Sequence, residues 1–211
     1  MKKGSNYLFF KQLLRHSDNF SYFLADEETK EAGIVDVSYN ADDLEEIIRT
    51  HAFVLKYIIN THGHADHVEG NLKLKDKFEA KIVGHKFTKT NIDLKVDDGD
   101  VLTIGKIPIK VIYTPGHTLD SICLLIEEKK LLTGDTLFVD ECGRTDLPGG
   151  SAKSLYNSLF NKLLKLGGEV EVYPGHDYGP KPSSTIQEQK ATNYVLQPRS
   201  LGDFVNFMNQ T

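Results

Sequence analysis

Three histidines and an aspartate lie within six consecutive positions, and this motif limits what the chain can fold into more than any other feature. The residues are His62, His64, Asp66 and His67. Only 8 histidines occur in the 211 residues, so chance is a poor explanation for the order His-x-His-x-Asp-His. An apolar run at 55–59 precedes the motif and a helical pattern at 72–78 follows it. The fold must therefore present these side chains where a strand ends and a helix begins.

The spacing within the motif suits two neighbouring cations. In an extended segment His62 and His64 point the same way, so both rings can reach one cation. Asp66 and His67 lie beyond the bend and can address a second cation. Imidazole nitrogens and carboxylate oxygens suit zinc, iron or manganese, and the lack of a cysteine here argues against a purely structural zinc site. We expect a metal with open coordination positions.

Three more candidate ligands each follow a strand-like run and sit in a turn that contains glycine. They are His117, Asp135 and His176. Glycine lets the backbone bend so that the next side chain aims across the edge of a sheet. Taken singly, such a histidine is more often a surface residue or a satisfied core group. Together with the first motif, these residues predict seven ligands that converge from four strand ends.

The hydrophobic pattern predicts a mixed architecture. Apolar runs predict strands at 7–12, 20–25, 32–36, 55–59, 82–83, 101–104, 107–113, 122–126, 130–132 and 170–173. Helical spacing predicts helices near 42–48, 72–78, 152–166, 184–194 and 200–208. Hairpins and strand–helix units together favour two mixed sheets packed against each other with helices outside. We expect one domain over residues 1–211, with a short helical extension after about residue 183.

Composition narrows the class of protein. Two cysteines, Cys123 and Cys142, cannot form a disulfide framework. The net charge is −5 and no stripe of lysine and arginine is dense enough to track phosphates, so a nucleic-acid partner is disfavoured. The apolar runs are too short for a membrane span, and no membrane partner is expected. These features favour a cytoplasmic enzyme with a small-molecule substrate.

The order of the motifs over nearly the whole chain resembles that of metallo-β-lactamase-fold proteins. The resemblance implies an α/β fold, an αββα sandwich of two mixed sheets flanked by helices, with metal at the sheet edges. It also implies one subsite of His62, His64 and His117, a second of Asp66, His67 and His176, and Asp135 as the bridge.

Within that family, the segments 133–146, 152–156 and 173–178 resemble the glutathione persulfide dioxygenases, or sulfur dioxygenases. This branch implies one iron(II) per chain, held by His62, His117 and Asp135. Two histidines and a carboxylate on one face of iron(II) leave adjacent positions for a substrate sulfur and for dioxygen. The implied reaction converts glutathione persulfide, oxygen and water to sulfite and the thiol. The remaining motif residues would tune and orient the site, with catalytic parts for Asp66, His67 and His176.

A second branch would use the same seven ligands differently. Glyoxalase II-like hydroxyacylglutathione hydrolases hold two zinc ions, or zinc with iron, and generate hydroxide that attacks a thioester carbonyl. These enzymes usually carry a longer helical C-terminal region, whereas only 35 residues follow His176. The short tail favours the dioxygenase, but compact hydrolases keep the alternative open. A non-catalytic metal-binding scaffold is a third hypothesis, against which the complete ligand set counts.

Two residues outside the ligand set are candidates for substrate binding. Arg144 could pair with a substrate carboxylate, or could form a structural salt bridge with Asp140, Glu141 or Asp146. Tyr178 could hydrogen-bond the substrate, or could cap its loop. Cys142 is expected to pack under Arg144, Cys123 to lie in the core, and His16, His51 and His85 to have no role. Three questions stay open: which thiol carries the substrate, which metal is bound, and whether the chain forms the homodimer that relatives suggest.

Overall fold

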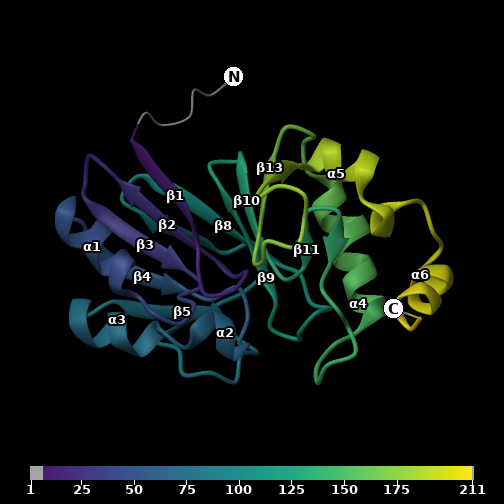
Figure 1. Cartoon of the computed structure of the whole chain (residues 1–211), viewed down its shortest axis with the longest axis horizontal. Helices are drawn as coiled ribbons and strands as arrows, with labels where there is room; N and C mark the ends of the chain where they lie inside the picture. The colour runs from purple at the N-terminus through teal and green to yellow at the C-terminus, as the bar shows by residue number, and fades with distance from the viewer. Residues whose placement is uncertain (1–6, 211) are drawn as a thin grey trace.

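Two β-sheets face each other, and helices cover their outer sides, in the computed structural model, which describes residues 7–210 (Figure 1). The first sheet has six strands in the order β1 (Leu8–Leu14), β2 (Phe20–Asp26), β3 (Glu31–Val35), β4 (Val54–Ile59), β5 (Lys81–His85) and β6 (Leu94–Val96). The second has six in the order β14 (Ser184–Thr185), β13 (Glu171–Pro174), β10 (Lys130–Gly134), β9 (Ile122–Ile126), β8 (Ile107–Tyr113) and β7 (Val101–Ile104).

Both sheets mix parallel and antiparallel pairs. In the first, β1, β2 and β3 pair antiparallel, and β3 to β6 pair parallel. In the second, only β10 and β13 pair parallel. This arrangement confirms the predicted sandwich of two mixed sheets. A small hairpin of β11 (Leu137–Phe138) and β12 (Glu141–Cys142) stands apart from both sheets.

Alternation along the central strands builds the layers. In β2, Phe20, Tyr22 and Leu24 join the core between the sheets, whereas Phe23 and Ala25 join a second core under the helices. Strand β9 alternates in the same way. Its even-numbered residues enter the core between the sheets, and its odd-numbered residues enter a third core on the outer face of the second sheet. A strand that buries both faces reads as a continuous apolar run, which explains the predicted strands here.

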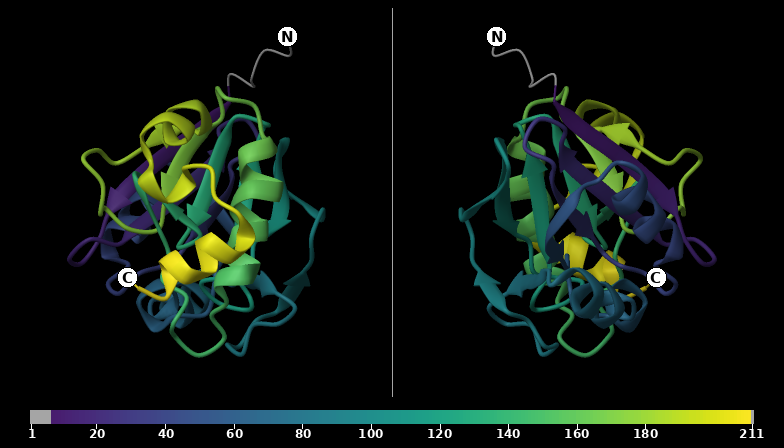
Figure 2. Two further views of the ribbon diagram at one scale, coloured as in Figure 1. Left: turned by 90° about the vertical axis from the view of Figure 1, so that its right-hand side faces the viewer. Right: turned by 90° about the vertical axis from the view of Figure 1, so that its left-hand side faces the viewer.

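Helices cover the outer face of each sheet. Over the first lie α1 (Asp42–Thr50) and α3 (Asn71–Phe78), preceded by the short α2 (Ala65–Val68). Over the second lie α4 (Ala152–Tyr156), η1 (Asn157–Lys162), η2 (Leu163–Lys165), α5 (Ile186–Thr192), η3 (Tyr194–Leu196) and α6 (Leu201–Met208). Helix α6 lies across α4 (Figure 2, left).

The helix predicted over 152–166 is helical from Ala152 to Lys165, but it is not one α-helix. Residues Asn157–Lys162 form wider π-type turns, and Leu163–Lys165 form a 3-10 turn. Leu155, Leu159 and Leu163 are buried as the pattern predicts. An α-helix rotates residues four apart by about 40° from one another, and the wider π-type turns rotate them in the opposite sense, so the two together keep these leucines in one row against the sheet.

Other differences concern short elements. The helix predicted at 184–194 begins only at Ile186, because Ser184–Thr185 pairs with β13 and the Thr185 hydroxyl accepts a hydrogen bond from the Glu188 backbone N–H. Strands β6, β11 and β12 were not predicted, since two or three residues carry too little pattern. No helix of residues 7–210 is long and apolar enough to cross a membrane.

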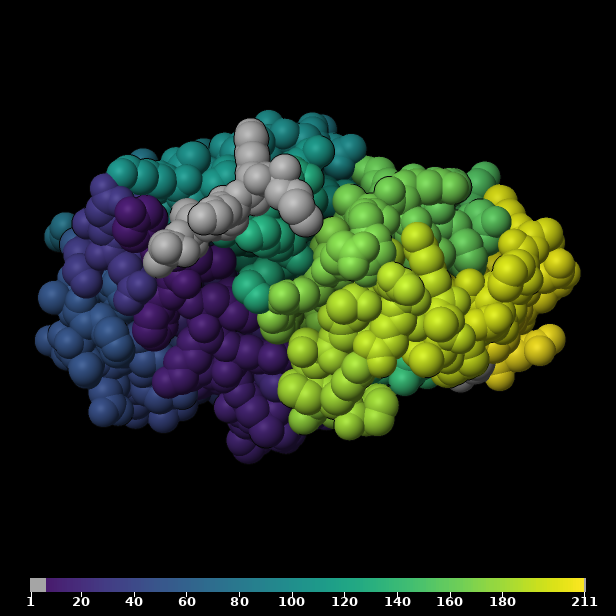
Figure 3. Space-filling view, turned by 90° about the horizontal axis from the view of Figure 1, so that it is seen from above, coloured from purple at the N-terminus to yellow at the C-terminus, as the bar shows by residue number. Residues whose placement is uncertain are grey.

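The two halves of the chain occupy opposite sides of the molecule. Seen from above, early residues, purple to teal, fill one side, and later residues, green to yellow, fill the other (Figure 3). The core between the sheets joins them, because it combines residues of β2, β4 and β5 with residues of β7 to β10. The loops at one end of this joint carry the predicted ligands.

Candidate metal centre

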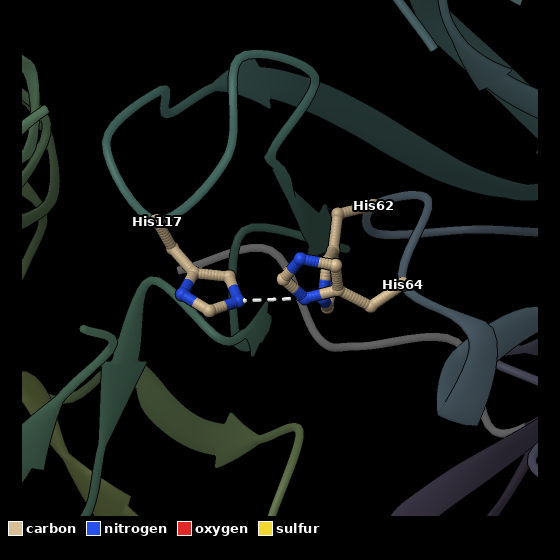
Figure 4. A group of neighbouring side chains, drawn as sticks. All are labelled: His62, His64 and His117. Atoms are coloured by element: carbon tan, nitrogen blue, oxygen red, sulfur yellow. Dashed lines mark hydrogen bonds between the residues drawn. The ribbon is translucent and has the colours of Figure 1, made fainter. Parts of the chain in front are cut away.

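All seven predicted ligands come together in the structure. His62 and His64 follow β4, Asp66 and His67 lie in α2, and the others follow β8, β10 and β13. His62 and His64, from the loop after β4, approach His117, from the loop after β8 (Figure 4). The described residues form three overlapping groups able to hold a metal: His62 with His64 and His117, His62 with His67 and Asp135, and Asp66 with His67 and His176.

The first group is built from imidazole nitrogens. Nδ1 of His64 lies 3.0 Å from Nε2 of His62 and 3.0 Å from Nε2 of His117. His62 and His117 are buried, whereas His64 is partly exposed. The sequence expectation that His62 and His64 face the same point agrees with this geometry. One side of this group therefore stays open toward solvent.

The group of Asp66, His67 and His176, called the second group from here on, mixes imidazoles with a carboxylate. Nε2 of His67 lies 3.1 Å from Nε2 of His176. Oδ2 of Asp66 is 3.3 Å from the first nitrogen and 3.4 Å from the second. This is the set that the resemblance assigned to the second subsite.

Asp135 lies between the first group, of His62, His64 and His117, and the second group, of Asp66, His67 and His176. Its Oδ2 is 3.5 Å from Nε2 of His117, 4.0 Å from Nε2 of His62 and 3.3 Å from Nε2 of His176. Its Oδ1 is 3.4 Å from Nε2 of His67, and this buried oxygen has no hydrogen-bond partner. A buried acceptor without a donor is costly unless a cation satisfies it.

The outward nitrogen of four of these imidazoles is held by another group. Nδ1 of His117 donates to the Arg144 carbonyl at 2.9 Å. Each of the other three lies 3.1 Å from an oxygen: His62 from Thr61 Oγ1, His67 from Asp36 Oδ2 and His176 from Asp18 Oδ1. The Thr61 hydroxyl donates to Asp36 at 2.7 Å, so it can accept from His62. A neutral ring that donates outward presents the lone pair of its other nitrogen inward.

This arrangement fits a metal ion. The nitrogens and carboxylates that converge at about 3 Å need positive charge between them, and without a cation the Asp135 oxygen stays unsatisfied. Imidazole and carboxylate together are the donors that zinc and iron take in catalytic sites. The donor set therefore supports a metal cofactor.

The pKa shifts describe the same demand for positive charge. Burial alone would raise the pKa of Asp135, but His67 and the other neighbouring histidines hold it well below its usual range. Burial opposes protonation of His176, yet its bonds to Asp135 and Asp66 raise its pKa to about 10. Burial keeps the pKa of His62 well below its usual value. The carboxylates thus favour positive charge in the second group, whether a protonated imidazole or a metal ion. His62 remains a neutral imidazole that can donate a lone pair to a metal.

A cavity of about 180 Å³ opens on the centre between His117, Asp135, Arg144 and Tyr178. The side chain of Arg144 is exposed, and its guanidinium makes two hydrogen bonds to Asp146 at 2.7 and 2.6 Å. One of the salt bridges considered for Arg144 is therefore present. The Tyr178 ring stacks on His176 at 4.8 Å between centroids, and 54% of the residue is exposed. Both predicted substrate-binding residues line the entrance.

The cysteines and remaining histidines stay outside the ligand groups. Cys123 is buried in the core, as expected. Cys142 is also buried, with its Sγ 3.9 Å from Sδ of Met208, and burial raises the pKa of its thiol. His16, His51 and His85 make aromatic contacts away from the centre.

Sequence reasoning missed four residues that support the ligands. Asp36, Asp18 and Thr61 hold imidazoles, and the Asn19 amide donates to Oδ2 of Asp66 at 2.9 Å. Asp36 directly follows the apolar strand β3, in the same way that Asp135 follows β10. That shared position was the available signal. No comparable pattern marks Asp18 or Asn19.

Residues 17–176 match the metallo-beta-lactamase superfamily, and the chain belongs to this family. Persulfide dioxygenase ETHE1, mitochondrial, of Homo sapiens is 34% identical over 91% of this chain and 76% of its own length. Hydroxyacylglutathione hydrolase of Brucella anthropi is 38% identical over 90% of this chain and 73% of its own length. The crystal structure of ETHE1 from Myxococcus xanthus superposes with a TM-score of 0.90 at 33% identity, covering 95% of this chain and 90% of that one.

These similarities confirm the predicted family and its branch, since both kinds of relative named from the sequence occur among the matches. Both are named as enzymes. A more distant structure, TTHA1623 in a di-iron-bound form, has a TM-score of 0.74 at 24% identity and supports the fold alone.

Proposed function

We propose that this protein is a metal-dependent dioxygenase that oxidises a low-molecular-weight thiol persulfide. The observation that carries the proposal is the superposition on ETHE1 from Myxococcus xanthus, with a TM-score of 0.90 over 90% of that chain. The full set of seven converging ligands supports it. With glutathione as the carrier, one persulfide, one dioxygen and one water give one thiol, one sulfite and two protons.

The proposed cofactor is one iron(II) per chain, with His62, His117 and Asp135 as its ligands. Iron(II) bound there would supply the redox chemistry that activates dioxygen toward a persulfide sulfur. The proposal is supported by the nitrogens that face inward and by the buried Asp135 oxygen without a partner. The other four motif residues, His64, Asp66, His67 and His176, would line the site.

Two of these residues, Asp66 and His176, are placed to transfer protons. Asp66 and His176 form a close pair at the centre, with Oδ2 of Asp66 3.4 Å from Nε2 of His176. Asp18 and Asn19 fix the orientation of this pair from outside. An imidazole and a carboxylate held this way can take and return a proton, which the water-consuming step of the reaction requires.

At the entrance, Tyr178 and Arg144 would orient the persulfide. Tyr178 lies flat on His176, so its hydroxyl can reach a substrate atom at the rim. Arg144 now gives both hydrogen bonds of its fork to Asp146, so it would bind a substrate carboxylate only in exchange for Asp146. We infer a small-molecule substrate and no nucleic-acid partner. The cytoplasmic location and the homodimer stay predictions.

Oxygen uptake by iron(II)-loaded protein with glutathione persulfide tests the proposal. S-lactoylglutathione hydrolysis is measured on the same preparation. Rapid uptake that yields sulfite and thiol in equal amounts supports the dioxygenase. Activity that needs zinc only and consumes no oxygen contradicts it.

The second candidate function is hydrolysis of a hydroxyacylglutathione thioester on two zinc ions, or on zinc with iron. Its support is the 38% identity to the hydrolase of Brucella anthropi, together with the second ligand group. In this case Asp135 would bridge both metals, and the same experiment would give thioester hydrolysis without oxygen uptake.

A further inference from the structure

A second cavity lies next to the entrance of the metal centre. It has a volume of about 560 Å³ and shares Glu141, Cys142 and Arg144 with the cavity at the centre. Its far side is formed by Phe207 and Met208 of α6. We call this second cavity the distal groove. Because the two cavities share these lining residues, the distal groove lies within reach of the far end of a small molecule whose sulfur is at the metal centre.

The charges that line the distal groove do not suit a polyanion. Its lining contains one cationic side chain, Arg144, and two carboxylates, Glu141 and Asp146. Both hydrogen bonds of the Arg144 fork go to Asp146, which cancels the single positive charge. The charge that remains is therefore the carboxylate of Glu141.

A further cation, Arg199, contacts two lining residues of the groove but is engaged elsewhere. Arg199 donates to the backbone carbonyls of Tyr194 and Val195 at 2.9 and 2.7 Å, and its guanidinium stacks on Phe207 at 4.2 Å. The Tyr194 hydroxyl donates to Glu141, which raises the pKa of Tyr194 to about 12. Tyr194 therefore lines the groove as a neutral side chain whose proton is already donated to Glu141.

The floor of the distal groove is apolar. The sulfur atoms of Cys142 and Met208 are 3.9 Å apart, and Phe207 lies beside them. Such a surface suits the carbon chain of a small thiol, whereas phosphate groups would lose water there without gaining cationic partners.

Resting on the proposed function, we propose that the distal groove receives the non-sulfur end of the thiol carrier and selects carriers whose far end is uncharged or cationic over polyanionic carriers such as coenzyme A. Glu141 and Asp146 are the specificity-determining residues. Glutathione, with two carboxylates and one ammonium group, is accommodated less well than a form of it in which the carboxylates are esterified.

Binding of unreactive thioethers to the metal-loaded protein tests the inference without turnover. Calorimetry compares S-methylglutathione, its diethyl ester and S-methyl-coenzyme A. We expect the diethyl ester to bind tightest and the coenzyme A derivative weakest, with about 3- to 10-fold in Kd for each charge that faces the carboxylates. Added salt should narrow the difference, because it screens charges at the open groove.

Variants identify the residues responsible. Glu141→Gln and Asp146→Asn should each bring the three affinities closer together, and Asp146→Asn should help the anionic ligands more because it also frees Arg144. Glu46→Gln, an exposed position on α1 at the other end of the molecule, is the matched control and should leave the order unchanged (Figure 1). Tightest binding of the coenzyme A derivative, equal binding of all three or no measurable binding would each overturn the inference.

The inference and the proposed function can fail separately. If the thioethers bind in the expected order but no persulfide is oxidised, the groove is supported and the dioxygenase is rejected. The persulfides of the same three carriers are then compared as substrates. If all three are oxidised with equal KM values and the thioethers bind equally, the dioxygenase is supported and the charge selection is wrong.

Discussion

Asp36 accepts two hydrogen bonds from Thr61, one from the backbone N–H at 2.8 Å and one from the hydroxyl at 2.7 Å. The same carboxylate lies 3.1 Å from Nδ1 of His67, and the Thr61 hydroxyl lies 3.1 Å from Nδ1 of His62. One buried aspartate therefore orients a ligand of each metal-binding group, directly in one case and through threonine in the other.

Replacing Thr61 tests this connection. Thr61→Val keeps the shape of the side chain but removes the oxygen that faces His62, so we expect metal affinity to fall by about 10- to 100-fold. Competition with a chromophoric chelator measures the affinity. Thr61→Ser keeps the hydroxyl and should bind metal as the unmodified protein does. Equal affinities for Val and Ser would show that the hydroxyl does not orient His62.

Metal stoichiometry distinguishes one ion from two. His62→Ala or Asp135→Ala should abolish metal retention and activity, because each removes a proposed iron ligand. His176→Ala should keep about one ion per chain and lose activity. Metal analysis after gel filtration gives the ratio. Two ions in the unmodified protein and one in His176→Ala would instead support the two-metal hydrolase.

Two glycines with positive φ offer a test of packing beside the centre. Gly134 has φ of +47°, and a Cβ there would lie 2.5 Å from Thr61 Oγ1. Gly99 has φ of +85°, and a Cβ there would meet nothing within 4 Å. Gly99→Ala should lower the free energy of unfolding by about 1–2 kcal/mol from backbone strain, and Gly134→Ala by about 1–3 kcal/mol more from overpacking. Urea denaturation measures both, and equal losses would contradict the close contact.

His85 predicts a dependence of stability on pH. Its side chain is buried and stacks on Tyr113 at 4.1 Å, and burial lowers its pKa. The unfolded chain takes up a proton near pH 6.5, whereas the folded chain does so only at lower pH. Stability is therefore full above pH 6.5 and falls as the pH drops toward the folded pKa, by at most about 1.4 kcal/mol per pH unit.

The His85→Gln variant isolates this effect. The difference in unfolding free energy between the unmodified protein and the variant should become smaller as the pH falls from 7 to 5. His51→Gln, at an exposed histidine, is the matched control for the loss of an imidazole. A constant difference for His85→Gln would mean that His85 does not titrate differently on folding.

The sequence predicted best where local chemistry determines local structure. The hairpin of Val101–Ile104 and Ile107–Tyr113 has the predicted bounds, since Gly105 and Lys106 mark its turn between two apolar runs. Both faces of β9 are buried, and its run of five apolar residues was predicted completely. The seven candidate ligands could be selected because they stand in dense or repeated motifs, and their side chains converge.

What the sequence could not provide depends on distant contacts. Asp18 is 158 positions from His176, and nothing near Asp18 in the chain indicates a partner for a histidine. Arg144 contributes through its backbone carbonyl, which no residue type reveals. The π-type turns at Asn157–Lys162 follow from the fit of a row of leucines to a sheet. These features exist only after the layers have packed.

The ligands also divide the chain in an unequal way. His62, His64, Asp66 and His67 belong to the first sheet and its helices, whereas His117, Asp135 and His176 belong to the second. Neither sheet alone supplies a complete set for a metal. A bound cation would cross-link two layers that otherwise pack through apolar side chains. Its binding free energy would add to the stability of their association. Metal supply would then control how firmly the two layers stay closed at the end where substrate enters.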